Sequence, residues 1–491
     1  ARTTVRRSAR ARQTASPRAA DRAANRADRQ ASRLTPSRPA TALLRRAYKL
    51  LPPEQSGARL ALLRRIAENR LNSGNPVQAL RLYRLAERMS GTSQIDPRVF
   101  LRLGLLNEAR DFLERQLNHD RSAAYARSPE AHREPTLLLS QLCGLLGDTE
   151  ASLRYAQEGL ESARQLGSAL SEAVAHIRLG HALQLQPHPD ASAANAHYLQ
   201  AMAFADAFTV QRSKAAAYLG MALLHGFNGD IDAARAAVRE GLTIVERTGD
   251  SWTAARLWTA LGVVGASNAT PEAGEWLAEA EQRHRACSDA YSLTVVQLSL
   301  SIWHHRCGRL DKAQQHARDA LRRAQRGGYV GLLTRPTLFG PRDRMALVPV
   351  LLAGRLPDTS KGAADLRLWS QELLAQAFPS ITADDATITY HPGSTLRIQV
   401  LERLRVWRGG EEVEPRAWQR KKAQQMLALL LTNRHRWLLR EQICDWLWAD
   451  DSEADAETQF KVTLNALNAV LEPARPPRTP PFYIRRQGGA Y

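Results

Sequence analysis

The feature that most constrains the fold is a repeat of about forty residues in the middle of the chain. Its register begins at Gly147, His188, Gly229, Ala269 and Gly308, in steps of 41, 41, 40 and 39 residues. Repeats of this length belong to architectures in which each copy is one supersecondary unit that stacks on the next. Such a chain folds as a solenoid rather than around one central core.

Turns and small side chains recur within each copy of the repeat. Gly147-Asp148, Gly229-Asp230 and Gly308-Arg309 are turn dipeptides between helical segments. Two antiparallel helices approach closely only where one side chain is minimal. A small residue follows each register position by five residues: Ser152, Ala193, Ala234, Gly274 and Ala313. We therefore predict stacked antiparallel helix hairpins over residues 41–328.

Composition agrees with a mainly α-helical protein. The 491 residues are rich in Ala, Leu and Arg, which favour helices, and a chain of this length holds about two to four domains. The sequence has no apolar run of about twenty residues, so it predicts no membrane span. No secretory signal is evident. The four cysteines are far apart in sequence and suit neither a disulfide framework nor a zinc site. We expect a cytoplasmic protein.

Positive charge is concentrated at the N-terminal end. The net charge is +19, from 68 basic and 49 acidic side chains, and residues 1–40 alone hold eleven Arg against two Asp. This tail has no apolar periodicity and is predicted to be disordered. The tail has three alternative interpretations. It is an electrostatic arm that binds nucleic acid, an unstructured extension or misassigned start, or an Arg-rich transit peptide.

The last hundred residues follow another pattern. Alternating β-branched residues at 395–401 and 404–407, followed by Gly409-Gly410, predict a hairpin. Three amphipathic segments then predict helices over 416–433, 439–448 and 456–471, and 482–491 ends the chain as a second hairpin with a diglycine tip. This order predicts a winged helix-turn-helix domain over residues 394–491.

The third predicted helix carries the candidate recognition face. Phe460, Leu464, Leu467 and Leu471 form an apolar seam, and polar residues lie between them. A helix fits the DNA major groove, where polar side chains reach base edges, and basic groups beside it grip phosphate. The candidate DNA-binding residues are Gln459, Lys461, Thr463, Asn465 and Asn468 on this helix, with Arg420, Lys421, Lys422, Arg440, Arg485 and Arg486 around it.

Several of these pieces resemble the OmpR-type winged helix of response regulators and Streptomyces antibiotic regulatory proteins. The matching segments are LERLRVWRGGEEV (401–413), the basic cluster 420–422, LREQICDWLW (439–448), VTLNALNAVLEP (462–473) and YIRRQGGAY (483–491). The resemblance implies a transcription regulator of the cytoplasm and nucleoid that binds double-stranded DNA. The family carries arginines in the second half of its recognition helix, whereas this chain has Asn465 to Leu471 without any. The alternative is an interaction scaffold whose winged helix no longer reads DNA.

The helical repeats resemble tetratricopeptide repeats, in the forty-residue form of MalT-type bacterial regulators. Stacked hairpins of this kind form a concave groove. The resemblance implies that the groove binds a protein or peptide partner, RNA polymerase among the candidates, or a small effector, and that the chain can form a homodimer. The alternative is that the repeats serve only as a spacer.

Residues 329–393 are punctuated by prolines and predict packed connecting structure up to the turn His391-Pro392-Gly393. No catalytic constellation is found, so we expect no enzyme activity, no cofactor and no metal. Residues 354–362 only faintly match a phosphate loop, because Ser360 replaces its second glycine. His304, His305 and Cys307 are interpreted as a solvated helix end, and the tryptophans of the repeats as packing residues.

Overall fold

The computed structural model describes residues 38–91, 95–122, 129–207, 211–357, 362–382 and 388–491. The predicted N-terminal tail lies outside these ranges except for its last residues. The chain divides into two compact units, one of residues up to 264 with 274–296 and 323–340, the other of 265–273, 297–322 and 341–491. The domain boundaries expected after residues 40, 328 and 393 stay predictions.

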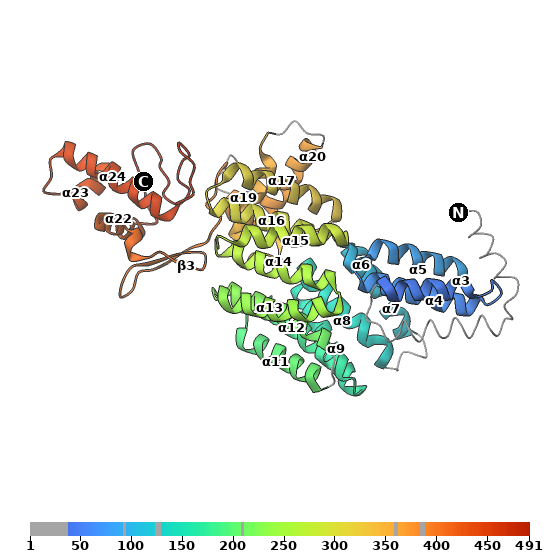
Figure 1. Ribbon diagram of the computed structural model, residues 1–491. Coiled ribbons are helices and arrows are strands. Elements are labelled where there is room, and N and C mark those ends of the chain that lie inside the picture. Colours follow the sequence, from blue (N-terminus) through green and yellow to red (C-terminus); the bar gives the residue numbers. More distant parts are fainter. Residues whose placement is uncertain (1–37, 92–94, 123–128, 208–210, 358–361, 383–387) are drawn as a thin grey trace. The chain divides into compact units, whose positions relative to one another are not determined.

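The protein is mainly α-helical, as the sequence predicts (Figure 1). The helices before the C-terminal domain are α3 (Arg38–Leu50), α4 (Ser56–Asn72), α5 (Pro76–Ser90), α6 (Arg98–Leu103), α7 (Leu106–Ser122), α8 (Pro129–Leu146), α9 (Thr149–Gln165), α10 (Ala169–Leu183), α11 (Ala191–Ala207), α12 (Gln211–Phe227), α13 (Ile231–Thr248), α14 (Ser251–Ser267), α15 (Ala273–Cys287), α16 (Ala290–Arg306), α17 (Leu310–Gly327), α18 (Val330–Thr334), η1 (Arg344–Leu347), α19 (Val348–Arg355), α20 (Ala363–Ala377) and α21 (Pro379–Thr382).

The predicted repeat is a series of antiparallel helix hairpins. Helices α11, α12 and α13 lie side by side (Figure 1). The register glycines Gly147, Gly229 and Gly308 end the first helix of a hairpin with φ of +82°, +92° and +70°, a conformation that a Cβ disfavours. The side chains of Asp148 and Asp230 then cap the second helix, accepting from the backbone N of the residue three positions on. The glycine-aspartate pairs therefore specify the turns, and the hairpin prediction is confirmed.

A serine hydroxyl marks the close approach of two helices in two of the hairpins. Ser140 Oγ donates to the carbonyl of Ser152 at 2.8 Å, and Ser301 Oγ donates to the carbonyl of Ala313 at 2.9 Å, with the same sequence separation of twelve residues. A larger side chain at position 152 or 313 would hold the two backbones too far apart for this bond.

Two of the predicted close-approach positions are shifted by one residue. Ala193 and Gly274 are only half-buried, and their neighbours Ala194 and Ala273 are the buried small residues. The turns that precede α11 and α15 are longer than the others, since α10 ends at Leu183 and α14 at Ser267. The longer turns displace the register of the following helix.

The segment after the last hairpin packs against the first helices of earlier hairpins within the first unit. The Tyr329 hydroxyl donates to the carbonyl of Gly104 at 2.8 Å, and the amide of Leu338 donates to the carbonyl of Gly144 at 3.0 Å. Thr337, Leu338 and Phe339 are buried. Residues 329–340 are therefore packed structure. They lie along the face of the repeats that is formed by the first helix of each hairpin.

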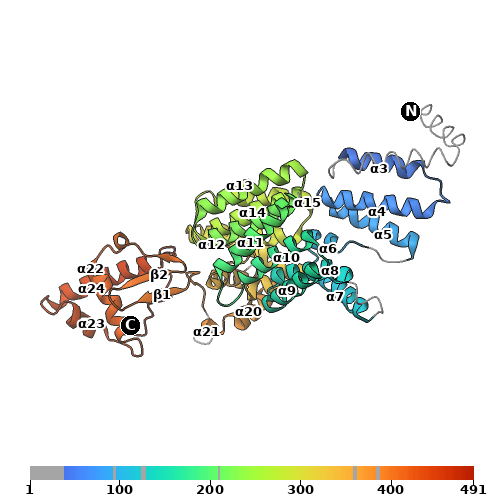
Figure 2. The ribbon, with the colours of Figure 1, turned by 90° about the horizontal axis from the view of Figure 1, so that it is seen from below.

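The C-terminal domain combines a small sheet with three helices. The strands β1 (Leu396–Gln399), β2 (Arg405–Arg408) and β3 (Glu411–Glu412) are antiparallel in the order β1-β2-β3, with Ile398 opposite Val406. A short η2 (Pro415–Ala417) precedes α22 (Lys421–Thr432), α23 (Arg440–Leu447) and α24 (Glu453–Leu471). Figure 2 shows β1 and β2 beside these helices. The domain is thus a small α+β unit in which the sheet precedes the three helices.

The closing hairpin is less regular than predicted. Residues 482–491 form single bridges, Gln487 with Ala490 and Leu439 with Ala490, where two strands were expected. Two backbone hydrogen bonds of 3.0 and 2.8 Å join Leu438 and Tyr491. The diglycine at 488–489 turns so tightly that little strand remains on either side.

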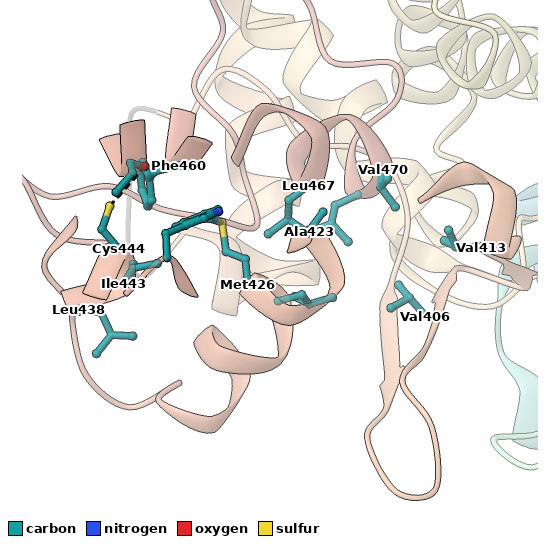
Figure 3. Packing of buried hydrophobic residues seen from close by; sticks show 14 residues of the cluster. Val406, Val413, Ala423, Met426, Leu438, Ile443, Cys444, Phe460, Leu467 and Val470 are labelled. Atoms are coloured by element: carbon teal, nitrogen blue, oxygen red, sulfur yellow. Dashed lines mark hydrogen bonds between the residues drawn. The ribbon is translucent and has the colours of Figure 1, made fainter. Parts of the chain in front are cut away.

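One apolar core holds the C-terminal domain together (Figure 3). Phe460 and Leu467 of α24 meet Met426 of α22 and Ile443 of α23, and all four are buried. Val406 of β2 joins the same cluster. Burying side chains of this size contributes about 1.5–3 kcal/mol each, so the core fixes which face of α24 points outward.

Candidate nucleic-acid interface

The outward face of α24 presents three of the five polar residues predicted on it. Gln459, Lys461 and Asn465 are exposed. Thr463 and Asn468 retain only 1% and 3% of their accessible surface, so neither can reach a base edge. The prediction that they lie on the outer face is wrong. Both are three or four positions from residues of the apolar seam, and with 3.6 residues per turn this spacing puts them on the buried side of the helix.

Thr463 and Asn468 instead belong to the interior of the domain. Thr463 Oγ1 and Asn468 Oδ1 are buried and have no hydrogen-bond partner among the residues that the structure describes. A buried polar atom without a partner costs free energy. Both residues are therefore local weaknesses of the domain core rather than contact residues.

The basic start of α22 lies beside α24. Arg420 Nη1 donates to Gln459 Oε1 at 3.4 Å, which places a guanidinium next to an exposed amide of the candidate recognition face. Lys421 is exposed. The Lys422 ammonium instead donates to the carbonyl of Leu447 and lies 5.7 Å from the centre of the Trp448 ring, at the end of α23.

An acidic residue on α24 neutralises two of the predicted cations. The Glu457 carboxylate lies 2.7 Å from Arg440 Nη1 and 2.9 Å from Lys461 Nζ. The hydrogen bond from Lys461, followed by the charge of Arg440, lowers the pKa of Glu457. Arg440 also contacts Glu441 at 2.9 Å. The sequence interpretation missed Glu457, although its spacing of four residues before Lys461 is that of a helical ion pair.

The closing hairpin supplies two exposed arginines. Arg486 Nε donates to the carbonyl of Gly488 at 2.8 Å and its guanidinium lies 5.8 Å from the Tyr491 ring. Arg485 lies 5.9 Å from the Phe482 ring. The Tyr491 ring contacts the Phe460 ring of α24 at a centroid distance of 5.1 Å. The hairpin is thus anchored on α24, and its guanidinium groups lie at the surface.

A groove on the same domain was not predicted. It has a volume of about 480 Å³ and is lined by apolar residues of α22 and β1, by the loop 433–437 and by the closing hairpin. Trp437 at its edge is 51% exposed. The tryptophan in a polar loop, RHRWLL, was the sequence signal that could have drawn attention to it.

Metal binding and membrane spanning find no support in the described residues. No group of three or more His, Cys, Asp or Glu side chains in them could hold a metal ion, and none of their helices is long and apolar enough to cross a membrane. His304 and His305 are buried, so the interpretation of a solvated helix end is wrong for them, while Cys307 is exposed. His304 stacks on His316 at 5.3 Å. Part of the weak phosphate-loop match, 358–361, lies outside the described residues.

Comparison with known proteins adds little to this geometry. No family model and no curated protein matches the chain. Among solved structures it is similar to a signal transduction ATPase with numerous domains that has a tetratricopeptide repeat sensor, from Pyrococcus horikoshii, at 13% identity and a TM-score of 0.38. The match covers 71% of this chain and 54% of that one, so this chain spans about half the length of that protein. The likeness is too distant to indicate an activity.

Proposed function

We propose that this chain is a DNA-binding transcription regulator whose helical repeats bind a partner or an effector, and that it carries out no chemical reaction. The observation that carries the proposal is the exposed edge of α24, where Gln459, Lys461 and Asn465 point outward and Arg420 contacts Gln459. Amide side chains at such positions are suited to pair with adenine in the major groove.

The surroundings of α24 support a DNA-binding role. Arg485 and Arg486 on the closing hairpin supply exposed positive charge beside the helix, and Lys421 adds to it at the start of α22. Charges of this kind contribute affinity that does not depend on sequence. The proposal treats the domain as an OmpR-type winged helix, with α24 as its recognition helix and the closing hairpin as its wing.

The partners follow from this proposal. Double-stranded DNA is the partner of the winged helix, and a protein such as RNA polymerase, a peptide or a small effector is the partner of the repeats. A homodimer would match a DNA site with two half-sites. Such a protein acts in the cytoplasm, on the nucleoid.

A scaffold without DNA binding is the alternative, and Glu457 favours it. Its carboxylate pairs with Arg440 and Lys461, which leaves the candidate face less basic than the sequence indicated. The groove beside Trp437 gives such a scaffold an apolar surface for another protein. Both features are consistent with a winged helix that serves as a protein interface.

A DNA-binding assay with the full-length chain separates the two functions. Genomic DNA fragments are selected at several salt concentrations, and the enriched fragments are sequenced. A regulator enriches a common sequence, and the logarithm of its affinity falls steeply with the logarithm of salt concentration. A chain that retains no fragment, or retains all of them equally, is not a sequence-specific regulator.

A further inference from the structure

The groove of about 480 Å³ on the C-terminal domain has an apolar floor, and all of its lining belongs to one compact unit. Helix α22 contributes Leu427, Leu430 and Leu431 to the floor, and β1 contributes Leu396 and Ile398. Four of these five side chains keep part of their accessible surface, and Leu427 is buried. The groove therefore leaves apolar surface in water at the edge of the core, and a partner that covers this surface gains its burial.

Positive charge lies along the border of the groove. Arg434, His435 and Arg436 belong to the loop after α22, and Arg485 belongs to the closing hairpin. All four are exposed. Among the described residues that line the groove, none is an aspartate or a glutamate. An apolar centre with charged groups at its border is the arrangement of a protein–protein interface.

The loop arginines are held by the loop itself and not by acids. Arg436 Nε donates to Asn433 Oδ1 at 2.8 Å, and Asn433 Nδ2 donates to the carbonyl of Leu429 at 2.9 Å. Arg434 Nη1 donates to the carbonyl of Leu431 at 3.3 Å. Neither arginine has an ion pair with a carboxylate within 4 Å in the part of the chain that the structure describes. These hydrogen bonds leave the positive charge of both arginines unneutralised.

Trp437 adds a large apolar side chain at the edge of the groove, where it is 51% exposed. The next residue, Leu438, is buried, and two backbone hydrogen bonds join it to Tyr491. The backbone that carries the indole is therefore held in place. Tryptophan and arginine are the residue types that most often carry the binding energy of an interface.

We propose that this groove binds a short acidic segment of another protein. Leucine or aromatic side chains of the segment lie on the apolar floor and against Trp437, and its carboxylates lie beside Arg434 and Arg436. Planar guanidinium groups match the oxygens of a carboxylate. Amphipathic segments are recognised in this way by apolar grooves on other proteins.

The apolar floor favours a protein over DNA as the occupant. A phosphate backbone gains from the arginines, but it has no apolar side chain to bury against leucine. The exposed residues of the candidate recognition face, Gln459, Lys461 and Asn465, lie outside the lining of the groove. The inference goes beyond the proposed function, which assigns the protein partner to the repeats. Peptide binding is measured without DNA, so the two proposals fail separately.

Selection from a library of random peptides displayed on phage, with the full-length chain as bait, tests the groove. We expect enrichment of peptides in which aspartate or glutamate flanks leucine or aromatic residues. The most enriched peptide is then synthesised with a fluorescein label and titrated by anisotropy. Trp437→Ser should weaken its affinity at least about tenfold. Arg434→Gln combined with Arg436→Gln should weaken it roughly 3- to 10-fold and reduce its dependence on salt.

Two control variants match the altered side chains. Trp446 on α23 is also 51% exposed but lies outside the groove, so Trp446→Ser should bind the peptide as the original chain does. Arg403 is exposed and lies outside the groove as well, and Arg403→Gln should likewise leave the affinity unchanged. Equal losses in Trp437→Ser and Trp446→Ser, or enrichment of peptides without acidic residues, overturns the proposal.

The other occupants of the groove give different results. If DNA occupies it, no acidic peptide is enriched, and the double arginine variant loses affinity for an unrelated duplex. If a second copy of this chain occupies it, no peptide is enriched, and sedimentation velocity shows an oligomer that Trp437→Ser dissociates. Absence of any enriched peptide overturns the proposal in every case.

Discussion

Arg440, the first residue of α23, donates to the carboxylate of Glu457 on α24 across 2.7 Å. The bond joins a candidate DNA-binding cation to an acid on α24, the candidate recognition helix. Lys461 shares the same carboxylate. One glutamate therefore decides how much positive charge this face presents, and it is the most informative residue for the proposed function.

Glu457→Gln should strengthen DNA binding. The substitution keeps the shape of the side chain and removes the charge that competes with phosphate for Arg440 and Lys461. If both cations then contact phosphate, the plot of log affinity against log salt steepens by about 0.9 for each contact. Glu441→Gln is the control, since Glu441 pairs with one of these two cations, Arg440, and its removal should have the smaller effect. Equal affinities of both variants and the original chain for DNA would mean that DNA binds at another surface of the protein.

Arg485→Ala combined with Arg486→Ala should weaken binding to every DNA sequence alike. Both guanidinium groups are exposed beside α24, where the proposed function has them contact phosphate rather than bases. Fluorescence anisotropy with specific and unrelated duplexes should show the same proportional loss and a smaller salt slope. A loss confined to the specific duplex would assign these arginines to base reading.

Asn465→Ala and Asn468→Ala should behave differently. Asn465 is exposed and its loss should relax the preference for one base pair, measured with a panel of single-base variants of the selected site, at about 1–3 kcal/mol of discrimination. Asn468 is buried, so its replacement should leave the base preference unchanged and alter the unfolding temperature. A base-specific effect of Asn468→Ala would contradict the packing of α24.

The stability of the second unit should fall as the pH falls below about 6.5, the ordinary pKa of histidine. Burial and the neighbouring His305 lower the pKa of His391 to about 3, and burial lowers that of His305 to about 4. The unfolded chain takes up protons near pH 6.5 that the folded chain refuses, so stability is complete above that pH and is lost on acidification.

Urea unfolding at about pH 7 and about pH 5.5 measures this loss, which reaches about 1.4 kcal/mol per pH unit for each histidine. His391 Nδ1 accepts from the amide of Gly393 at 2.9 Å, a bond that only the neutral ring can make. His391→Asn should lower stability at pH 7 but show a smaller difference between the two pH values. An unchanged difference would assign the loss to other groups.

Gly220→Ala should destabilise the repeats by about 1–3 kcal/mol. A Cβ at Gly220 of α12 would overlap the ring of the fully buried Tyr198, which lies on α11 and also contacts Gly180 of α10. The gain in helix propensity of up to about 1 kcal/mol is smaller than the cost of the overlap. Gly57→Ala on α4 is the control, because its Cβ would meet nothing within 4 Å. Urea unfolding of both variants should show that Gly220→Ala is less stable than Gly57→Ala.

The hairpins could be predicted from the sequence because their signals are local. A glycine with positive φ, an aspartate cap and a small residue in the next helix are all within a few positions of one another, as at Gly147, Asp148 and Ser152. The first hairpin and the three helices of the C-terminal domain were predicted for the same reason, from their turns and amphipathic segments. The one-residue shifts at Ala193 and Gly274 came from turns whose length the sequence does not reveal.

The outward face of α24 was only partly predictable. An apolar seam defines an inward direction, but its width depends on how many neighbours surround the helix. With α22, α23 and the closing hairpin all packed on it, the buried face widens to include Thr463 and Asn468. The ion pair between Arg440 and Glu457 joins two helices, and no spacing rule within one helix could have revealed it.

The bond between the Tyr329 hydroxyl and the Gly104 carbonyl spans 225 residues of chain. Solenoids ordinarily fray from their ends, because each hairpin holds only its neighbours. Here the turn after α6 and the turn before α18 are hydrogen-bonded to each other. Neither end of this stretch can therefore unfold without breaking its contact with the other end. Amides from α6 to α18 should therefore exchange with solvent together, in one opening event, and Tyr329→Phe should release the two ends to exchange independently.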